Sequence, residues 1–163
     1  MNTIDLSFIA TRLEADIRSI IREEVRKICM DTLKEVINST VYANPVVMYQ
    51  RTHGFLNAVD ITFSSIGSTS AEFFLTVNPG KIAPFIPPAP GAPLVKGARW
   101  GKHVDFDGSH VTDTLIKRLD EGFSNKYYSR PGAKFFDKTQ KELGNKIPQI
   151  MRAALMARGW EVS

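Results

Sequence analysis

The chain has 163 residues, of which 43% are hydrophobic and 23% charged, with a formal net charge of +4. These values predict one globular domain with a core of its own and exclude a chain that is disordered as a whole. We expect no signal peptide, no membrane span and no disulfide framework, and we expect the single Cys29 to be a small buried side chain in a reducing compartment.

Residues 7–39 are predicted to form one long helix. Ser7 can cap its start, because a serine oxygen accepts a hydrogen bond from a free N–H of the first turn. Apolar residues then recur at helical spacing, at Leu13, Ile17, Ile20, Ile21, Val25, Ile28, Val36 and Ile37. This stripe is longer than a small sheet can cover, so we expect part of it to pack on a second copy.

A short helix and a hairpin are predicted over residues 49–80. Asn44-Pro45 interrupts the chain, since a residue before proline avoids the helical region. Residues 49–59 then carry apolar side chains on one side of a short helix. The subsequent alternation, on either side of the turn at 67–70, is typical of two paired strands.

Residues 81–110 are predicted to form an arm that leaves its own subunit. Five prolines between 84 and 93 favour polyproline II structure and exclude regular ladder pairing. Phe85, Ile86 and Trp100 need an apolar surface to cover them. We expect deletion of residues 84–98 to spare the fold and to abolish assembly.

Two further helices are predicted in the C-terminal part, 112–159. The first begins at Thr112 or Asp113 and ends at Gly122, and the second runs from about 134 to 158 despite Gly144 and Pro148. The order of elements indicates a single α+β domain over 1–163. In it, the long N-terminal helix and the C-terminal helices pack on a small antiparallel β-sheet.

The best candidate for reactive chemistry is a short polar segment after the arm. Imidazole and carboxylate are suitable ligands for zinc or manganese, and the segment holds His103, Asp105, Asp107 and His110. Their spacing matches no metal motif, and a polar loop turning at Asp107-Gly108 explains them better. The sequence shows no phosphate-binding loop either. We therefore predict no catalytic residue, no metal and no cofactor, so the protein is not expected to be an enzyme.

The positive charge lies near the C-terminus, where residues 96–163 carry thirteen basic and eight acidic side chains. An anionic neighbour, either DNA or an acidic protein, is one explanation of this excess, and a solvated basic face is the commoner one. Two clusters stand out: Lys96, Arg99 and Lys102, and then Lys126, Arg130 and Lys134.

Three segments carry a resemblance to a known group of proteins. They are "RTHGFL" at 51–56 within "VYANPVVMYQRTHGFLNAVDI", "LDEG" at 119–122, and "RPGAKF" at 130–135, which opens the last helix. Together they resemble the tail-completion and neck proteins of long-tailed bacteriophages. The chain departs from that group in the extra His53, in the proline-rich excursion and in the length of its first helix.

The resemblance implies a non-enzymatic α+β subunit of the virion. Members of the group form rings at the head–tail junction, where DNA passes, so the chain is expected to be a tail terminator, tail-completion or neck subunit in a hexamer or dodecamer. Implied partners are other neck, connector and tail-tube proteins, and non-specific contact with packaged DNA is expected as well. No contact with a membrane is expected, and assembly would take place in the host cytoplasm. Arg51 and Thr52 would anchor the short helix and orient Phe55 and Leu56 into the core. The alternative is that Arg51 is only a surface charge at the start of a helix.

The residues expected to take part in interactions are Arg51, Phe55, Phe85, Ile86, Lys96, Arg99, Trp100, Lys102, Lys126, Arg130 and Lys134. Two other functions stay open at this point. One is a nucleic-acid-binding protein that uses the basic C-terminal part. The other is a metal-dependent hydrolase built on the four residues of the segment 103–110.

Overall fold

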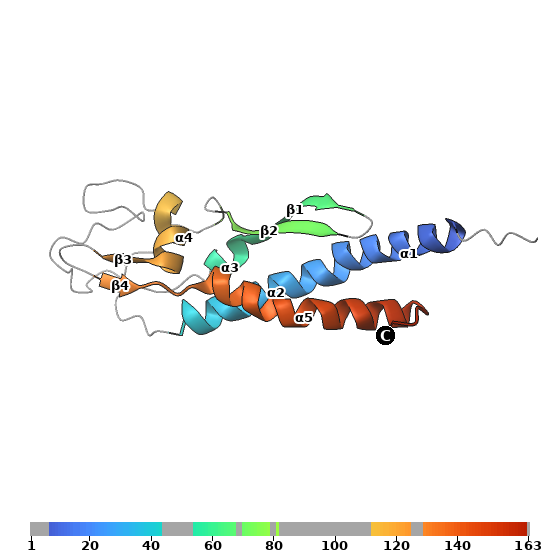
Figure 1. The fold of residues 1–163 in the computed structure, drawn as a ribbon. Coiled ribbons are helices and arrows are strands. Elements are labelled where there is room, and N and C mark those ends of the chain that lie inside the picture. Colours follow the sequence, from blue (N-terminus) through green and yellow to red (C-terminus); the bar gives the residue numbers. More distant parts are fainter. Residues whose placement is uncertain are drawn as a thin grey trace, which may run out of the picture.

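The computed structural model describes residues 7–43, 54–67, 70–78, 81, 112–124 and 129–162. Figure 1 shows an elongated molecule in which two long helical segments lie side by side and a β-hairpin covers one face of them. A second, smaller hairpin and a short helix lie at one end. This arrangement confirms the predicted α+β class.

The N-terminal helical rod consists of α1 (Ser7–Ile20), a π-helical turn η1 (Ile21–Val25) and α2 (Arg26–Thr40). The predicted helix over 7–39 is confirmed, but the π-helical turn was not predicted. Its hydrogen bonds reach five residues back instead of four, so the turn takes in an additional residue and rotates the rest of the rod about its axis. The side chains of Ile20, Val25 and Cys29 still reach the same core.

The C-terminal helix α5 (Phe135–Ala157) runs antiparallel to this rod (Figure 1). It passes through Gly144 and Pro148 without ending, which confirms the predicted range of about 134 to 158. A polar bridge helps to hold it to α2, because Lys146 Nζ donates to Thr32 Oγ1 at 3.2 Å and to Glu35 Oε2 at 3.3 Å. Tertiary contacts therefore outweigh the poor helix propensity of glycine and proline here.

The larger hairpin follows a short helix, α3 (Gly54–Ala58), and pairs β1 (Val59–Ile66) with β2 (Ala71–Val77) in antiparallel register. The predicted hairpin is thus confirmed, as is the end of the predicted short helix; residues 49–53 lie outside the described part. Phe63 stands opposite Phe73, and the register shifts between Phe63 and Ser65, which is a β-bulge. Such a bulge bends a strand and changes the direction of its side chains.

At the other end, α4 (Thr112–Glu121) leads into a second hairpin of β3 (Gly122–Ser124) and β4 (Ser129–Pro131). The predicted helix from 112 to 122 is confirmed, whereas the second hairpin was missed. Strands of three residues are too short to show an alternating pattern.

Two clusters form the core of the described residues. The first, near α3 and α4, contains Leu33, Val36, Ile37, Val41, Phe55, Ala58, Val59, Val77, Leu119 and Phe135. The second lies between the rod, α5 and the larger hairpin and contains Ile20, Val25, Cys29, Ile61, Leu143 and Ala154. The predicted arm lies outside the described residues, apart from Lys81.

Candidate functional site

The described parts of the three segments that carry the resemblance meet in one place, which we call the motif junction: Phe55, Asp120, Gly122, Gly132 and Phe135. Phe55 from α3 packs edge to face on Phe135 at the start of α5, with ring centroids 5.6 Å apart. Both rings are buried, Phe55 at 5% exposure and Phe135 at 0%. Segments about 80 residues apart in sequence are joined by this contact.

Asp120 caps the start of α5 from the end of α4. Its backbone carbonyl accepts a hydrogen bond from Lys134 N at 2.9 Å, and its Oδ1 accepts one from Phe136 N at 3.2 Å. Lys134 itself has a φ of 52°, in the left-handed region, which turns the chain into the helix. The first N–H groups of a helix lack partners within it, so Asp120 satisfies one of them and places its charge at the favourable end of the helix dipole.

The backbones of the second and third segments touch at two glycines. A Cβ on Gly132 would lie 2.4 Å from the carbonyl oxygen of Asp120, and a Cβ on Gly122 would lie 2.7 Å from Gly132 N. Gly122 also has a φ of +97°, which only glycine adopts without strain. At both positions the neighbouring backbone is so close that it leaves no room for a side chain, and glycine is therefore required.

The motif junction has the chemistry of a structural joint. Its side chains are two phenylalanines and one capping carboxylate, and none of these is a nucleophile or a matched acid–base pair. Next to it, the Arg118 guanidinium lies 4.4 Å from the centroid of the Phe123 ring, a cation–π contact that holds β3 against α4. The residues that carry the resemblance thus maintain the fold at this point.

The predicted interaction residues divide into three that the structure describes and eight that it does not. Phe55 is a core residue, so it confirms the expected inward orientation and offers almost no surface to a partner. Arg130 is half-buried in β4 opposite Phe123, and Lys134 is exposed. Outside the described residues lie Arg51, Phe85, Ile86, Lys96, Arg99, Trp100, Lys102 and Lys126, together with His103, Asp105, Asp107 and His110.

The described residues contain no group of three or more His, Cys, Asp or Glu side chains that could hold a metal ion. Cys29 is buried, and this burial raises the pKa of its thiol to about 11. A thiol with that pKa stays protonated near neutral pH and is a poor nucleophile. Within the same residues, no helix has the length and apolar character needed to cross a membrane.

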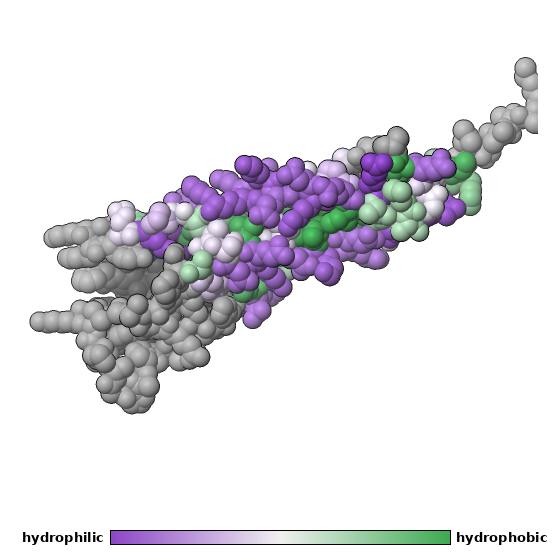
Figure 2. Space-filling view, turned by 90° about the horizontal axis from the view of Figure 1, so that it is seen from below, coloured by the Kyte–Doolittle hydropathy of each residue, from purple (hydrophilic) through white to green (hydrophobic). Residues whose placement is uncertain are grey.

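One exposed face of α5 carries basic and amide side chains that sequence reasoning did not single out. We call it the α5 polar stripe, and it consists of Lys138, Lys141, Asn145, Gln149 and Arg152. Their spacing of three or four residues places them on one side of the helix. That spacing was visible in the sequence, but the exposure of this side depended on which face of α5 packs on the rod. Figure 2, seen from the side on which α5 lies in Figure 1, shows mostly hydrophilic side chains.

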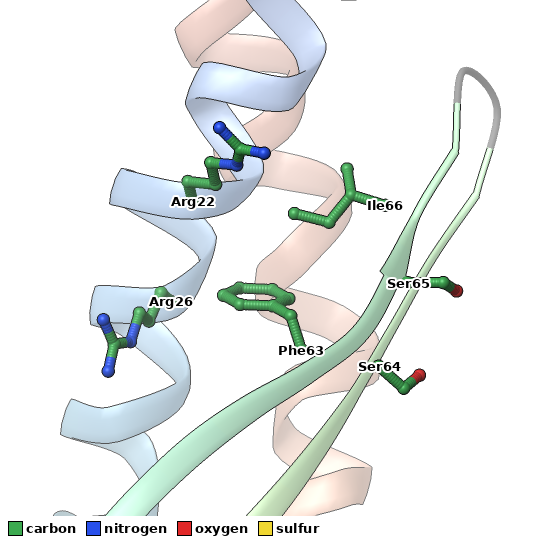
Figure 3. A pocket seen from close by; sticks show the side chains of 6 residues that line it. All are labelled: Arg22, Arg26, Phe63, Ser64, Ser65 and Ile66. Atoms are coloured by element: carbon green, nitrogen blue, oxygen red, sulfur yellow. The ribbon is translucent and has the colours of Figure 1, made fainter.

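A shallow pocket of about 500 Å³ lies between the rod and β1, lined by Arg22, Arg26, Phe63, Ser64, Ser65 and Ile66. In Figure 3, Phe63 and Ile66 point into the space between helix and strand, whereas the two serines point away from it. Arg26 is engaged with Asp60, at 3.3 Å between Nη2 and Oδ1. The pocket therefore combines an apolar floor with a basic rim.

Comparison of the chain with protein families, with curated proteins and with solved structures finds no match.

Proposed function

We propose that the chain is a structural, non-enzymatic subunit of a tailed bacteriophage virion that forms a ring at the head–tail junction. Its station there would be that of a tail terminator, tail-completion or neck subunit. The proposal rests on the sequence resemblance, and the motif junction supports it. The described parts of the three segments that carry the resemblance contact one another at Phe55–Phe135 and at Gly122–Gly132, so they form one structural unit.

The chemistry of the described residues favours a structural role over a catalytic one. The motif junction offers no reactive pair, and the pocket of about 500 Å³ has an apolar floor without an acid or base pointing into it. The surface instead offers contact area of different kinds: exposed apolar side chains at Phe8, Ile9 and Phe74, and the α5 polar stripe. Surfaces of this kind are typical of subunits that bind several neighbours.

The α5 polar stripe suits loose contact with DNA in the lumen of a ring. Lysine, arginine, asparagine and glutamine are side chains that contact phosphate oxygens, and such contacts carry no sequence information. Duplex DNA presents one charge per roughly 1.7 Å of its axis, so a few scattered cations are enough to attract it. A channel wall needs weak and unspecific contact of this sort, since DNA has to pass along it.

The mass of the full-length protein in solution tests the proposal. Light scattering after size exclusion is expected to show a closed oligomer, of six or twelve copies, and negative-stain images are expected to show rings. Antibodies against the chain should label the head–tail junction of the virions that contain it. A chain that stays monomeric at every concentration, and that is absent from virions, would contradict the proposal.

The second candidate is a nucleic-acid-binding protein that acts as a monomer, and the α5 polar stripe is the observation that favours it. The two functions differ in the species that binds DNA. A monomer that binds duplex DNA tightly, with an affinity that falls steeply with salt, supports the second candidate. Binding that requires the ring supports the first.

A further inference from the structure

Two surface features of the chain are complementary in chemistry, and they lie at different places along the N-terminal rod. The first is the end of the molecule where α1 begins, which we call the tip: Phe8, Ile9 and Glu161. The second is the pocket between the rod and β1. Our inference rests on the proposed ring and concerns how one copy contacts the next.

The tip presents apolar surface beside a free carboxylate. Phe8 is 73% exposed and Ile9 is 48% exposed, although both are large apolar side chains. Residues near the C-terminus are held against α1 one and two turns beyond Phe8, because Trp160 Nε1 donates to Asp16 Oδ2 at 2.8 Å and the Arg12 guanidinium lies over the Trp160 ring. The next residue, Glu161, is exposed.

Among the described residues around the tip, Glu161 is an exposed carboxylate without an ion pair. Asp16 and Glu24 are both engaged by Arg158, the latter at 2.9 Å. Glu161 makes no ion pair with any described residue. Figure 2 shows hydrophobic side chains at the same end of the molecule.

The pocket presents the opposite combination. Phe63 and Ile66 form a half-buried apolar floor, and Arg22 stands at its rim, exposed and without an ion pair to any described residue. Two backbone irregularities border this one place: the π-helical turn that carries Arg22, and the β-bulge between Phe63 and Ser65. Both kinds of irregularity are over-represented at functional sites, because each redirects side chains away from regular positions.

The tip cannot reach the pocket of its own chain. Phe8 and Arg22 are fourteen residues apart within one continuous helical rod, which at 1.5 Å per residue separates them by roughly 21 Å. A rigid helix does not fold back over that distance. A tip that occupies the pocket therefore belongs to another molecule.

We propose that the tip of one copy docks into the pocket of the next copy. Phe8 and Ile9 cover the floor formed by Phe63 and Ile66, and Glu161 pairs with Arg22. The two patches differ, so the contact is heterologous. Contacts of that kind propagate from copy to copy in one direction and close into a ring when the rotation allows it.

A charge exchange tests the pairing of Glu161 with Arg22. The variants are Arg22→Glu, Glu161→Arg and the double variant that carries both. The control is Lys117→Glu, since Lys117 is an exposed lysine on α4, at the end of the molecule opposite the tip (Figure 1). The readout is the protein concentration at which half of the chains are in rings, measured by analytical ultracentrifugation. Each single variant is expected to raise it by about tenfold or more, and the double variant is expected to restore most of the loss. The control should leave it unchanged.

Phe8→Asp and Ile66→Asp test the apolar part of the contact, and each is expected to give folded monomers. Circular dichroism melting of every variant checks that the fold is intact. If wild-type protein forms rings and both single charge variants assemble as it does, the proposed contact is wrong and the ring stands. If both single variants lose assembly and the double variant does not recover it, the pairing of Glu161 with Arg22 is wrong. A wild-type protein that forms no ring at all instead contradicts the proposed function.

Discussion

The aromatic rings of Phe55 and Phe135 meet edge to face, with an angle of 83° between their planes. Phe55 lies in the short helix before the larger hairpin, and Phe135 is the first residue of the last helix. The contact therefore ties the segment before the larger hairpin to the start of the last helix. Edge-to-face pairs of this geometry add to the stability that burial alone provides.

Replacing Phe135 with alanine is expected to lower the free energy of unfolding by about 3–5 kcal/mol, because the ring is fully buried and its removal leaves a cavity. Urea unfolding followed by circular dichroism measures this change. Phe74→Ala is the matched control, since Phe74 is 53% exposed on the larger hairpin, and we expect it to change stability by no more than about 0.5 kcal/mol. Equal effects of the two variants would show that the motif junction does not hold the fold.

Two glycine-to-alanine substitutions are expected to act in opposite directions. Gly132→Ala places a methyl group 2.4 Å from the backbone oxygen of Asp120, which should destabilise the protein by about 1–3 kcal/mol. At Gly144, within α5, an added Cβ meets nothing within 4 Å. Gly144→Ala should therefore stabilise the protein by about 0.5–1 kcal/mol, because alanine has the better helix propensity. Thermal unfolding of both variants at one pH compares them directly, and a stable Gly132→Ala protein would disprove the close approach.

Cys29 is expected to make the stability of the protein fall with pH above about 9. Burial raises the pKa of the thiol from 9.0 to about 11. Between these values the unfolded chain loses the thiol proton while the folded chain keeps it, so unfolding is increasingly favoured as the pH rises. The loss attributable to Cys29 should reach about 2–3 kcal/mol near pH 11.

The measurement for Cys29 is urea unfolding of wild type and Cys29→Ala at pH 7, 9 and 11. Other groups also titrate in this range, so the informative quantity is the difference in stability between the two proteins. The free energy of unfolding of wild type minus that of Cys29→Ala should be nearly constant from pH 7 to 9. It should then decrease towards pH 11, since only wild type loses the contribution of the protonated thiol. A difference that stays constant up to pH 11 would contradict the raised pKa.

Neutralising the α5 polar stripe is expected to weaken DNA binding without weakening the fold. Lys138, Lys141 and Arg152 are exposed, so their replacement by glutamine should change the free energy of unfolding little. If all three contact phosphates, the slope of log affinity against log salt should become shallower by about 3. Fluorescence anisotropy with duplex DNA at several salt concentrations gives the slope.

Lys146→Gln serves as the control for this experiment. Lys146 lies on the same helix but is engaged by Glu35 and Glu142, at 3.3 and 3.4 Å. Its loss should leave the salt slope as it is in wild type. An unchanged slope in the triple variant would place any DNA contact elsewhere on the chain.

The sequence by itself determined the local elements. The helix over 7–39, the larger hairpin and the last helix all follow from apolar residues at spacings of 3.6 or 2, and their observed bounds agree with the predicted ones within a few residues. These features depend on neighbours in the chain, which a sequence displays directly. The inward orientation of Phe55, in contrast, was expected from the resemblance.

Only the tertiary structure decided how the distant segments meet. The contact of Gly122 with Gly132, the capping of α5 by Asp120 and the pocket that joins Arg22 to Phe63 all bring together residues from separate elements. The π-helical turn and the β-bulge likewise border one pocket although they lie in separate elements. Periodicity shows which side of an element is apolar, but it does not show which other element covers that side, and so the exposed stripe on α5 and the pocket emerge only when the layers are assembled.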